Sequence, residues 1–510
     1  MHSTNKSHNN SLANAWLKLG IISLGLGGLY SIILVVLRTP QLSSFFLNQR
    51  IFKSALIIHV NLSILIWLLS ITASVWGNET SLRLVKRRGI FIPFGLLREI
   101  VTFYMFDRND VLYIYPKLAF FATLLIAISP LAGYNTVTNN YIPMLANIVF
   151  ILGLSLFGVT LLLYAINILY LFDWMKLNNL VNVTVFSTII MFILSFVCFG
   201  WSYKSLQKII QIIPIEIEFY YELLFWSGGH LLQFIYTQIL IFIWVSLLRT
   251  ITVRELKFQT FYLFILYLNF VFSILILFGH ISYDIIDIAF KEFYTDHMKY
   301  LGGIAPILCL VGMVVELVLM SYRDKLVLLI YRLSTKSSKI KKDCITLSNH
   351  RTHSIIKTIL LCSITLFLLG GLIAININDI NLVIPAHYHG SIVGISIACM
   401  GYSYQTIIPL MDHDIHKTTK QYLITLSINW IKFAIYLLTF GQILHILGLA
   451  FSGIYGVMRK DPNSIVPMSS KLLMGMMGIG GLIAIVGGLM FVYICGKTMF
   501  FLKGMKLEYE

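Results

Sequence analysis

The sequence predicts an all-α polytopic membrane protein of about twelve transmembrane helices. Of its 510 residues, 58% are hydrophobic and only 12% are charged, which is about half the charged share of an ordinary soluble domain. Apolar runs of roughly 20 residues, the length that crosses a bilayer core, recur along the whole chain. These runs leave no stretch for a soluble domain, so we expect a single transmembrane domain over residues 1–510.

Each predicted span is an apolar run between polar connections. The ranges are 16–37, 54–76, 117–135, 142–170, 180–202, 219–248, 259–282, 298–322, 355–377, 385–411, 421–453 and 471–500. A polar tail at residues 1–15 precedes the first span, and a basic loop at residues 323–354 is the longest polar connection. An even number of spans places both termini on the same side of the membrane.

Lysine and arginine are unevenly divided between the two sides. The loops after the second and eighth spans are rich in them, with Arg83, Lys86, Arg87, Arg88, Arg98, Lys336, Lys339, Lys341, Lys342 and Arg351, whereas the loops on the other side are poor in them. Loops rich in these residues face the cytoplasm in most membrane proteins. We therefore expect cytoplasmic termini and, as the location, a bacterial inner membrane. The formal charge of +16 then reflects basic loops rather than nucleic-acid binding.

Five histidines fall at a similar depth in the outer half of the predicted membrane region: His59, His230, His280, His387 and His389. Histidine inside a span is costly, so each one needs a partner. Taken singly, each is typical of a hydrogen-bonded interior histidine, but their common depth favours cofactor ligands. His387 and His389 are two positions apart, which turns a helix by about 200° and points the side chains to nearly opposite faces.

One helix can therefore serve two cofactors. His389 can pair with His59 around a six-coordinate haem, which has no open position and suits electron transfer. His387 would bind a second haem from one side only. The open face of that haem could meet a metal held by His230 and His280, because neutral imidazole binds both iron and copper. Such a pair of metals suits binding and reduction of a small diatomic molecule.

Three segments carry a resemblance to a known family. Trp226–His230 matches the pattern W-x-x-G-H, Pro385–His389 contains the paired histidines, and Gly456–Lys460 ends in a basic pair. Together with the spans, they resemble subunit I of the haem-copper oxidase superfamily, which includes terminal oxidases and nitric oxide reductases. The resemblance covers nearly the whole chain.

The resemblance implies roles for particular residues. It implies His59 and His389 as ligands of a low-spin haem and His387 as the ligand of a high-spin haem. It implies His230 and His280 as ligands of the B-site copper. The basic pair Arg459 and Lys460 would hold the haem propionates.

By the same resemblance, the chain is the catalytic subunit of a respiratory terminal oxidase similar to cytochrome c oxidase subunit I. It would pass electrons through the bis-histidine haem to a haem and metal site that reduces dioxygen. Two haems of unspecified type and one copper are implied, with iron in place of copper if the enzyme is reductase-like. The chain has no copper-binding cysteine pair, so we expect a separate electron-donor subunit or cytochrome c.

Two departures from the family pattern keep alternatives open. The seventh span supplies one histidine, His280, where the family usually has two, and Phe234 stands where many oxidases have a tyrosine. The chain could therefore be a nitric oxide reductase-like enzyme, or a non-catalytic haem-binding or transport protein that has lost the second metal. Glu316 and Tyr236 are the predicted proton path; an interfacial glutamate and an interhelical hydrogen bond are the alternatives.

Overall fold

The structure is a computed structural model and describes most of the chain. The described residues are 2–38, 49–84, 112–172, 177–252, 255–334, 347–377, 381–411, 417–458 and 468–501. Within them, twelve helical segments are long and apolar enough to cross a membrane. The predicted all-α fold with about twelve spans is confirmed.

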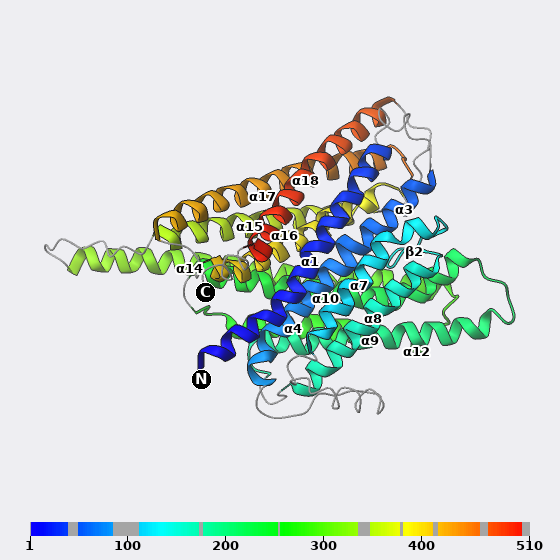
Figure 1. Cartoon of the computed structure of the whole chain (residues 1–510), viewed down its shortest axis with the longest axis horizontal. Helices are drawn as coiled ribbons and strands as arrows, with labels where there is room; N and C mark the ends of the chain where they lie inside the picture. Colours follow the sequence, from blue (N-terminus) through cyan, green and yellow to red (C-terminus); the bar gives the residue numbers. More distant parts are fainter. Residues whose placement is uncertain are drawn as a thin grey trace.

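Helices make up almost all of the described structure (Figure 1). In chain order they are α1 (His2–Arg38), α3 (Gln49–Val60), the π-helical turn η1 (Asn61–Ile66), α4 (Trp67–Leu84), α7 (Ile114–Ile128), the 3₁₀ turn η2 (Ser129–Ala132), α8 (Ile148–Leu171), α9 (Leu180–Ile209), α10 (Ile217–Thr252), α11 (Gln259–Leu275), α12 (Phe278–Ser282), α13 (Ile288–Leu301), α14 (Ile304–Ser334), α15 (Leu347–Ala374), α16 (Val383–Met411), α17 (Lys417–Ile454) and α18 (Met468–Phe501). They run side by side along one bundle, and the start of α1 and the end of α18 lie toward the same end (Figure 1).

The eighth span differs from the prediction. We predicted it to begin at residue 298, but the apolar segment runs over Ile288–Ser321 and consists of α13 and α14. Gly302 and Gly303 separate the two helices. The prediction missed α13 because polar residues such as Lys291 and Asp296 interrupt its apolar run. This correction matters because α13 packs against the predicted metal histidines.

A small hairpin joins the third and fourth spans, where the prediction left only a short connection. Its strands β1 (Thr136–Val137) and β2 (Met144–Leu145) are antiparallel, with Thr136 opposite Leu145. Asn147 then begins α8, since its side chain accepts from the backbone N–H of Phe150. The turn between the strands, residues 138–143, lies against α10.

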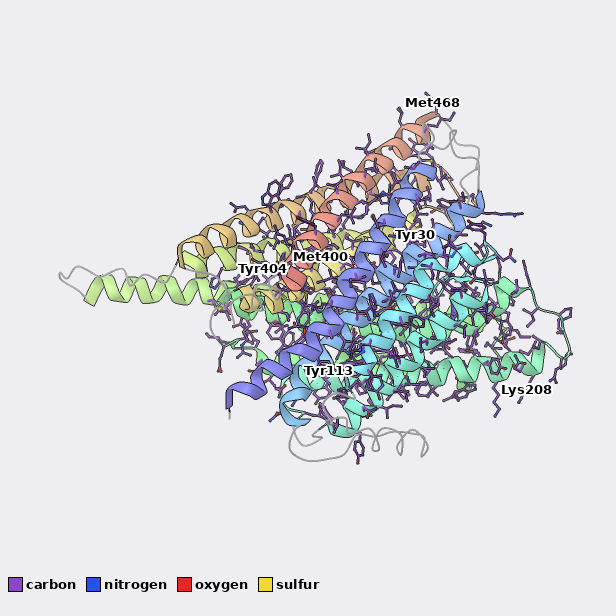
Figure 2. All side chains as sticks on the ribbon, viewed as in Figure 1. Tyr30, Tyr113, Lys208, Met400, Tyr404 and Met468 are labelled. Atoms are coloured by element: carbon purple, nitrogen blue, oxygen red, sulfur yellow. The ribbon has the colours of Figure 1, made fainter. Side chains whose placement is uncertain are left out.

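Large apolar side chains remain exposed on the described part of the bundle; Figure 2 draws the described side chains on the ribbon. Phe121, Phe264 and Phe433 each keep more than half of their surface. In water such surfaces would favour aggregation, whereas lipid solvates them at no cost. Some buried polar side chains bond across helices, as from the indole N–H of Trp67 to Ser396 and from that of Trp244 to Ser363.

Candidate haem and metal site

His59 is held in one tautomer by α1. It is the penultimate residue of α3, and its Nδ1 lies 2.9 Å from the carbonyl oxygen of Gly27. A carbonyl can only accept a hydrogen bond, so Nδ1 carries the proton and Nε2 keeps its lone pair. Histidines that ligate metals are commonly fixed in this way, with one ring N–H donated to the backbone.

The π-helical turn η1 begins two residues after His59. The Asn61 side-chain amide donates to the carbonyls of Ile57 (2.9 Å) and Pro143 (2.8 Å), which ties this turn to the hairpin after α7. The Ser63 hydroxyl donates to the carbonyl of His59 itself at 2.6 Å. Single π-helical turns inside long helices occur frequently at functional sites.

His387 is fixed by a close crossing of α15 and α16. Its Nδ1 lies 2.9 Å from the carbonyl oxygen of Gly370. Gly370 faces Gly390 so closely that a Cβ atom on either residue would collide with the backbone of the other helix. The absence of side chains lets the two backbones approach, which brings the Gly370 carbonyl within reach of the imidazole. His387 therefore has the same tautomer as His59.

His389 points away from this crossing, toward α17 and α3. Its ring centroid lies 4.6 Å from that of His445, and the two rings are inclined by 67°. His59 also lies within electrostatic range of His389. His389 thus contacts α17 and lies within electrostatic range of His59, while His387 contacts α15. The division of α16 between two cofactors stays a prediction.

These donors fit haem. His59 and His387 each donate Nδ1–H to a backbone carbonyl, which leaves Nε2 as the nitrogen that an iron would take. His59, His387 and His389 also keep some accessible surface, although they lie on spans in the bundle. Partly accessible imidazoles at this depth are expected to line a space that accommodates a cofactor.

His230 has both nitrogens engaged. It lies on α10 with 2% of its surface exposed. Nδ1 is 2.7 Å from the carbonyl oxygen of Trp226, and Nε2 is 2.9 Å from the hydroxyl of Tyr141. Because the carbonyl takes the Nδ1 proton, Nε2 must accept and the Tyr141 phenol must donate.

His280 lies in the short helix α12. Its Nε2 is 2.8 Å from the Ser227 hydroxyl, and its ring stacks on Trp201 at 5.0 Å between centroids. Tyr294 of α13 contacts both metal histidines, with its ring centroid 5.4 Å from that of His230 and 6.2 Å from that of His280. An aromatic ring that touches both imidazoles occupies space at the predicted metal position.

These residues, as arranged, do not fit a second metal ion. Within the described part of the chain, no group of three or more His, Cys, Asp or Glu side chains could hold one. His297 of α13 lies within electrostatic range of His230 but does not complete such a group.

Several buried polar atoms around His230 nevertheless lack a partner at hydrogen-bonding geometry. They are Nε1 of Trp226, the hydroxyl of Tyr294 and both ring nitrogens of His297. The Trp226 ring lies 5.3 Å from that of His230, and His297 is only 8% exposed. Buried polar atoms are nearly always bonded to protein, water or an ion. Their concentration here indicates a region suited to a polar ligand.

Glu316 caps a helix. Its carboxylate is fully buried and accepts from the backbone N–H groups of Lys257 (2.9 Å) and Phe258 (3.1 Å), directly before α11. A carboxylate at this position satisfies unpaired N–H groups and the positive end of the helix dipole. Tyr236 is buried on α10. Among the described residues, no hydrogen bond joins Glu316 or Tyr236 to His230.

A polar cluster lies two helical turns from His230 on α10. The Gln238 amide donates to the Ser187 hydroxyl (2.8 Å) and to the carbonyl of Leu266 (3.1 Å), and its oxygen accepts from Asn269 (2.7 Å). Asn269 also donates to the carbonyl of Phe234 at 3.2 Å. The cluster joins α9, α10 and α11 below the histidines.

Arg459 and Lys460 lie outside the described residues. The segment that leads to them is placed, because the N–H of Leu382 donates to the carbonyl of Val457 at 3.1 Å and Asn381 pairs with Met458. The chain immediately before the basic pair is therefore joined to the start of α16, five residues ahead of His387.

The twelve apolar helices among the described residues and the family match define an integral membrane protein of the haem-copper oxidase subunit I type. The chain belongs to the cytochrome C and quinol oxidase polypeptide I family, whose model matches residues 11–488. An uncharacterized protein of Aquifex aeolicus (strain VF5) is 25% identical over 397 residues, which cover 76% of this chain and 83% of the relative. A solved heme-copper terminal oxidase dimer matches with a TM-score of 0.62 at 13% identity, covering 96% of this chain and 84% of that chain. At that identity the likeness shows the fold alone.

Sequence reasoning missed Tyr141 and Tyr294. Tyr141 lies in a connection rather than a span, and only the hairpin pairing and α10 place it on His230. Tyr294 lies in the part of the eighth span that the prediction omitted. The spacing of Phe290, Tyr294 and His297 along one face of α13 was the available signal, since residues four and seven positions apart share a helix face.

Proposed function

We propose that this chain is the haem-bearing catalytic subunit of a membrane respiratory oxidase that reduces dioxygen. One observation carries the proposal. His59 on α3 and His387 on α16 each lie with Nδ1 on a backbone carbonyl, and His389 on α16 lies within electrostatic range of His59. Two haems, when bound, would supply electron transfer and a position for a diatomic gas.

The chain's own residues orient these groups. The Gly27 carbonyl fixes His59, and the Gly370 carbonyl fixes His387, each through Nδ1. His389 would serve the haem shared with His59. Arg459 and Lys460 are proposed to bind haem propionates through charge-assisted hydrogen bonds, which is supported by the pairing of the preceding segment with the start of α16.

A separate donor must deliver electrons. The five cysteines in the described part of the chain are buried and unpaired, on different helices. We therefore propose a donor subunit or a cytochrome c at the outer face. The basic loops support a cytoplasmic position of both termini, and we propose a bacterial inner membrane as the location. Glu316 and Tyr236 remain the proposed proton-uptake residues, with Gln238 and Asn269 as polar groups between the cytoplasmic side and His230.

Two alternatives have specific support. Phe234 in place of the usual tyrosine favours a nitric oxide reductase-like enzyme, in which iron would replace copper. The absence of a three-ligand metal group among the described residues favours a haem protein that works without a second metal. Each differs from the oxidase in its metal content.

Optical spectra and metal analysis of the purified protein test these proposals. Two haems, one of which binds carbon monoxide, together with one copper support the oxidase. Non-haem iron in place of copper supports the reductase, and no second metal supports the haem protein. A preparation that binds no haem when haem is supplied during expression would refute all three.

Single substitutions assign the ligands. His389→Ala should abolish the low-spin spectrum and leave the carbon monoxide-binding haem. His387→Ala should do the reverse. His353→Ala, at the far end of α15, is the matched control and should change neither. A low-spin spectrum that survives in His389→Ala would overturn the assignment of that residue.

A further inference from the structure

A cavity lies between the first turns of α10 and α13, and none of the proposed ligand histidines lines it. Phe219 and Trp226 are seven positions apart on α10 and share one face of it, as do Ile288, Lys291 and Thr295 on α13. The volume of the cavity is about 360 Å³, within the range of about 300–1,000 Å³ for small-molecule sites. Because two spans begin here, the cavity lies near the level at which the bundle leaves the membrane.

Two hydrogen-bond donors lie beside each other at this cavity. The side chain of Trp226 is only 8% exposed, and its Nε1 has no partner among the described residues. The ammonium of Lys291 lies 4.5 Å from the centroid of the same ring. The ion pair of Lys291 with Glu222 measures 3.7 Å, which is longer than a hydrogen bond, so the ammonium can still donate to a ligand. The two donors together favour an anionic oxygen, such as that of a phosphate.

Carboxylates also line the cavity. Asp287 is the N-cap residue of α13, but its side chain makes no capping hydrogen bond. Asp296 lies nine positions later, and both side chains are exposed. A carboxylate close to the membrane core is costly unless it meets a cation or water. Two donors and separate carboxylates in one cavity fit a ligand that carries both a phosphate and an ammonium group.

The remaining wall of the cavity is apolar. Phe219, Ile286 and Ile288 line it and are 40%, 42% and 76% exposed. The same span continues from α13 into α14, where Ile307 and Val311 are exposed as well. Such side chains are compatible with acyl chains. A soluble zwitterion has no apolar part to match this strip, whereas a phospholipid does.

We propose that this cavity binds the headgroup of a phospholipid that carries a primary amine, such as phosphatidylethanolamine. Nε1 of Trp226 and Nζ of Lys291 donate to the phosphate, Asp287 and Asp296 pair with the ammonium, and the acyl chains lie along α14. The inference goes beyond the proposed oxidase function and does not depend on bound haem. It accounts for the buried indole N–H without a partner and for carboxylates at the edge of the membrane.

Native mass spectrometry of the purified full-length protein, stripped of lipid by detergent, tests the proposal. Phosphatidylethanolamine and phosphatidylglycerol with identical acyl chains are the two probes, and only the first has an ammonium group. Titrations should show about tenfold tighter binding of phosphatidylethanolamine, the preference expected for one hydrogen-bonded charge pair. Soluble phosphoethanolamine has the headgroup without acyl chains and should not displace the lipid at equal concentration.

Two substitutions separate the phosphate from the ammonium. Lys291→Gln removes a donor to the phosphate, so the affinity for both lipids should fall about tenfold. Asp287→Asn should weaken phosphatidylethanolamine binding and leave phosphatidylglycerol binding unchanged or tighter. Lys299→Gln and Asp284→Asn are the matched controls, because they make the same changes of charge at residues that do not line the cavity. Both controls should bind as the wild type does.

Trp226→Phe keeps a ring beside Lys291 and removes the indole N–H, so it serves if Lys291→Gln fails to fold. Equal affinity for the two lipids, unchanged binding in both Lys291→Gln and Trp226→Phe, or an equal loss in Lys299→Gln would overturn the proposal. Displacement of the lipid by phosphoethanolamine at equal concentration would also overturn it. Haem spectra of the same samples keep the two proposals separate: intact haem without lipid selectivity rejects this inference alone, and lipid selectivity without haem rejects only the proposed function.

Discussion

The imidazoles of His389 and His445 meet edge to face, with their centroids 4.6 Å apart. His445 is itself anchored, because its Nδ1 donates to the carbonyl of Met477 on α18 at 2.8 Å. The last two spans therefore support the orientation of a proposed haem ligand on the tenth. Residues that position a ligand in this way influence both its affinity and its basicity.

Replacing His445 should alter the low-spin haem without removing it. We expect His445→Leu to retain both haems at purification but to weaken low-spin haem binding by roughly tenfold, since outer-shell partners contribute at about that level. The reduction potential of that haem should also move. Spectroelectrochemical titration checks both effects. A potential and a haem content identical to the wild type would show that His445 only fills space.

Alanine at Gly370 should disturb the crossing that fixes His387. Its Cβ would meet the backbone of Gly390 and Ser391, and overpacking of this kind costs about 1–3 kcal/mol. We expect a lower thermal midpoint in detergent and a reduced carbon monoxide-binding haem content. Gly371→Ala is the matched control, because no atom lies within 4 Å of a Cβ at that position. Equal behaviour of the two variants would contradict the close crossing.

Glu316→Gln separates a structural role from a proton-uptake role. The amide replaces a charged acceptor of two backbone hydrogen bonds at the start of α11, so we expect a loss of about 1–3 kcal/mol in stability. If Glu316 also delivers protons, turnover per folded molecule should fall as well. Stability is read from thermal unfolding, and turnover from oxygen uptake normalised to haem. Glu292→Gln, an exposed glutamate, should change neither.

Gln238→Leu should destabilise the bundle by roughly 1–2 kcal/mol. It removes three hydrogen bonds between α9, α10 and α11, and interhelical hydrogen bonds in membranes average about 0.6 kcal/mol each. Chemical denaturation in mixed micelles measures the loss. Gln233→Leu, on the same helix but outside this cluster, serves for comparison. A similar loss of stability in both variants would mean that the hydrogen bonds of Gln238 do not contribute to the stability of the bundle.

The spans were predictable because crossing a bilayer imposes one length and one composition on each of them. For every span except the eighth, at least one predicted end lies within a few residues of the end of the apolar helix in the structure. The predicted start of the eleventh span, residue 421, lies among residues whose side chains are not described. The predicted eighth span began ten residues too late. Polar side chains of α13 line the cavity beside α10, and they lower the hydropathy of a segment that is nevertheless helical.

The site was predictable only in part. Depth along a span follows from topology, so His59, His230, His387 and His389 could be grouped from sequence. Contacts made by loop residues could not be predicted. The position of Tyr141 depends on the hydrogen bond from the backbone N–H of Asn140 to the Glu222 carboxylate and on the absence of a side chain at Gly229. Nor does any residue pattern indicate that Tyr294 touches both His230 and His280.

The π-helical turn η1 gives the second span one residue more than a regular helix would use for the same rise. One residue corresponds to about 100° of rotation, so the half of the span that carries His59 is turned relative to the half that carries Trp67 and Trp76. If η1 is shortened by one residue, we expect the two tryptophans to keep their packing and His59 to lose its hydrogen bond to the Gly27 carbonyl. The π-helical turn thus sets the direction in which His59 points separately from the packing of the tryptophans in the other half of the span.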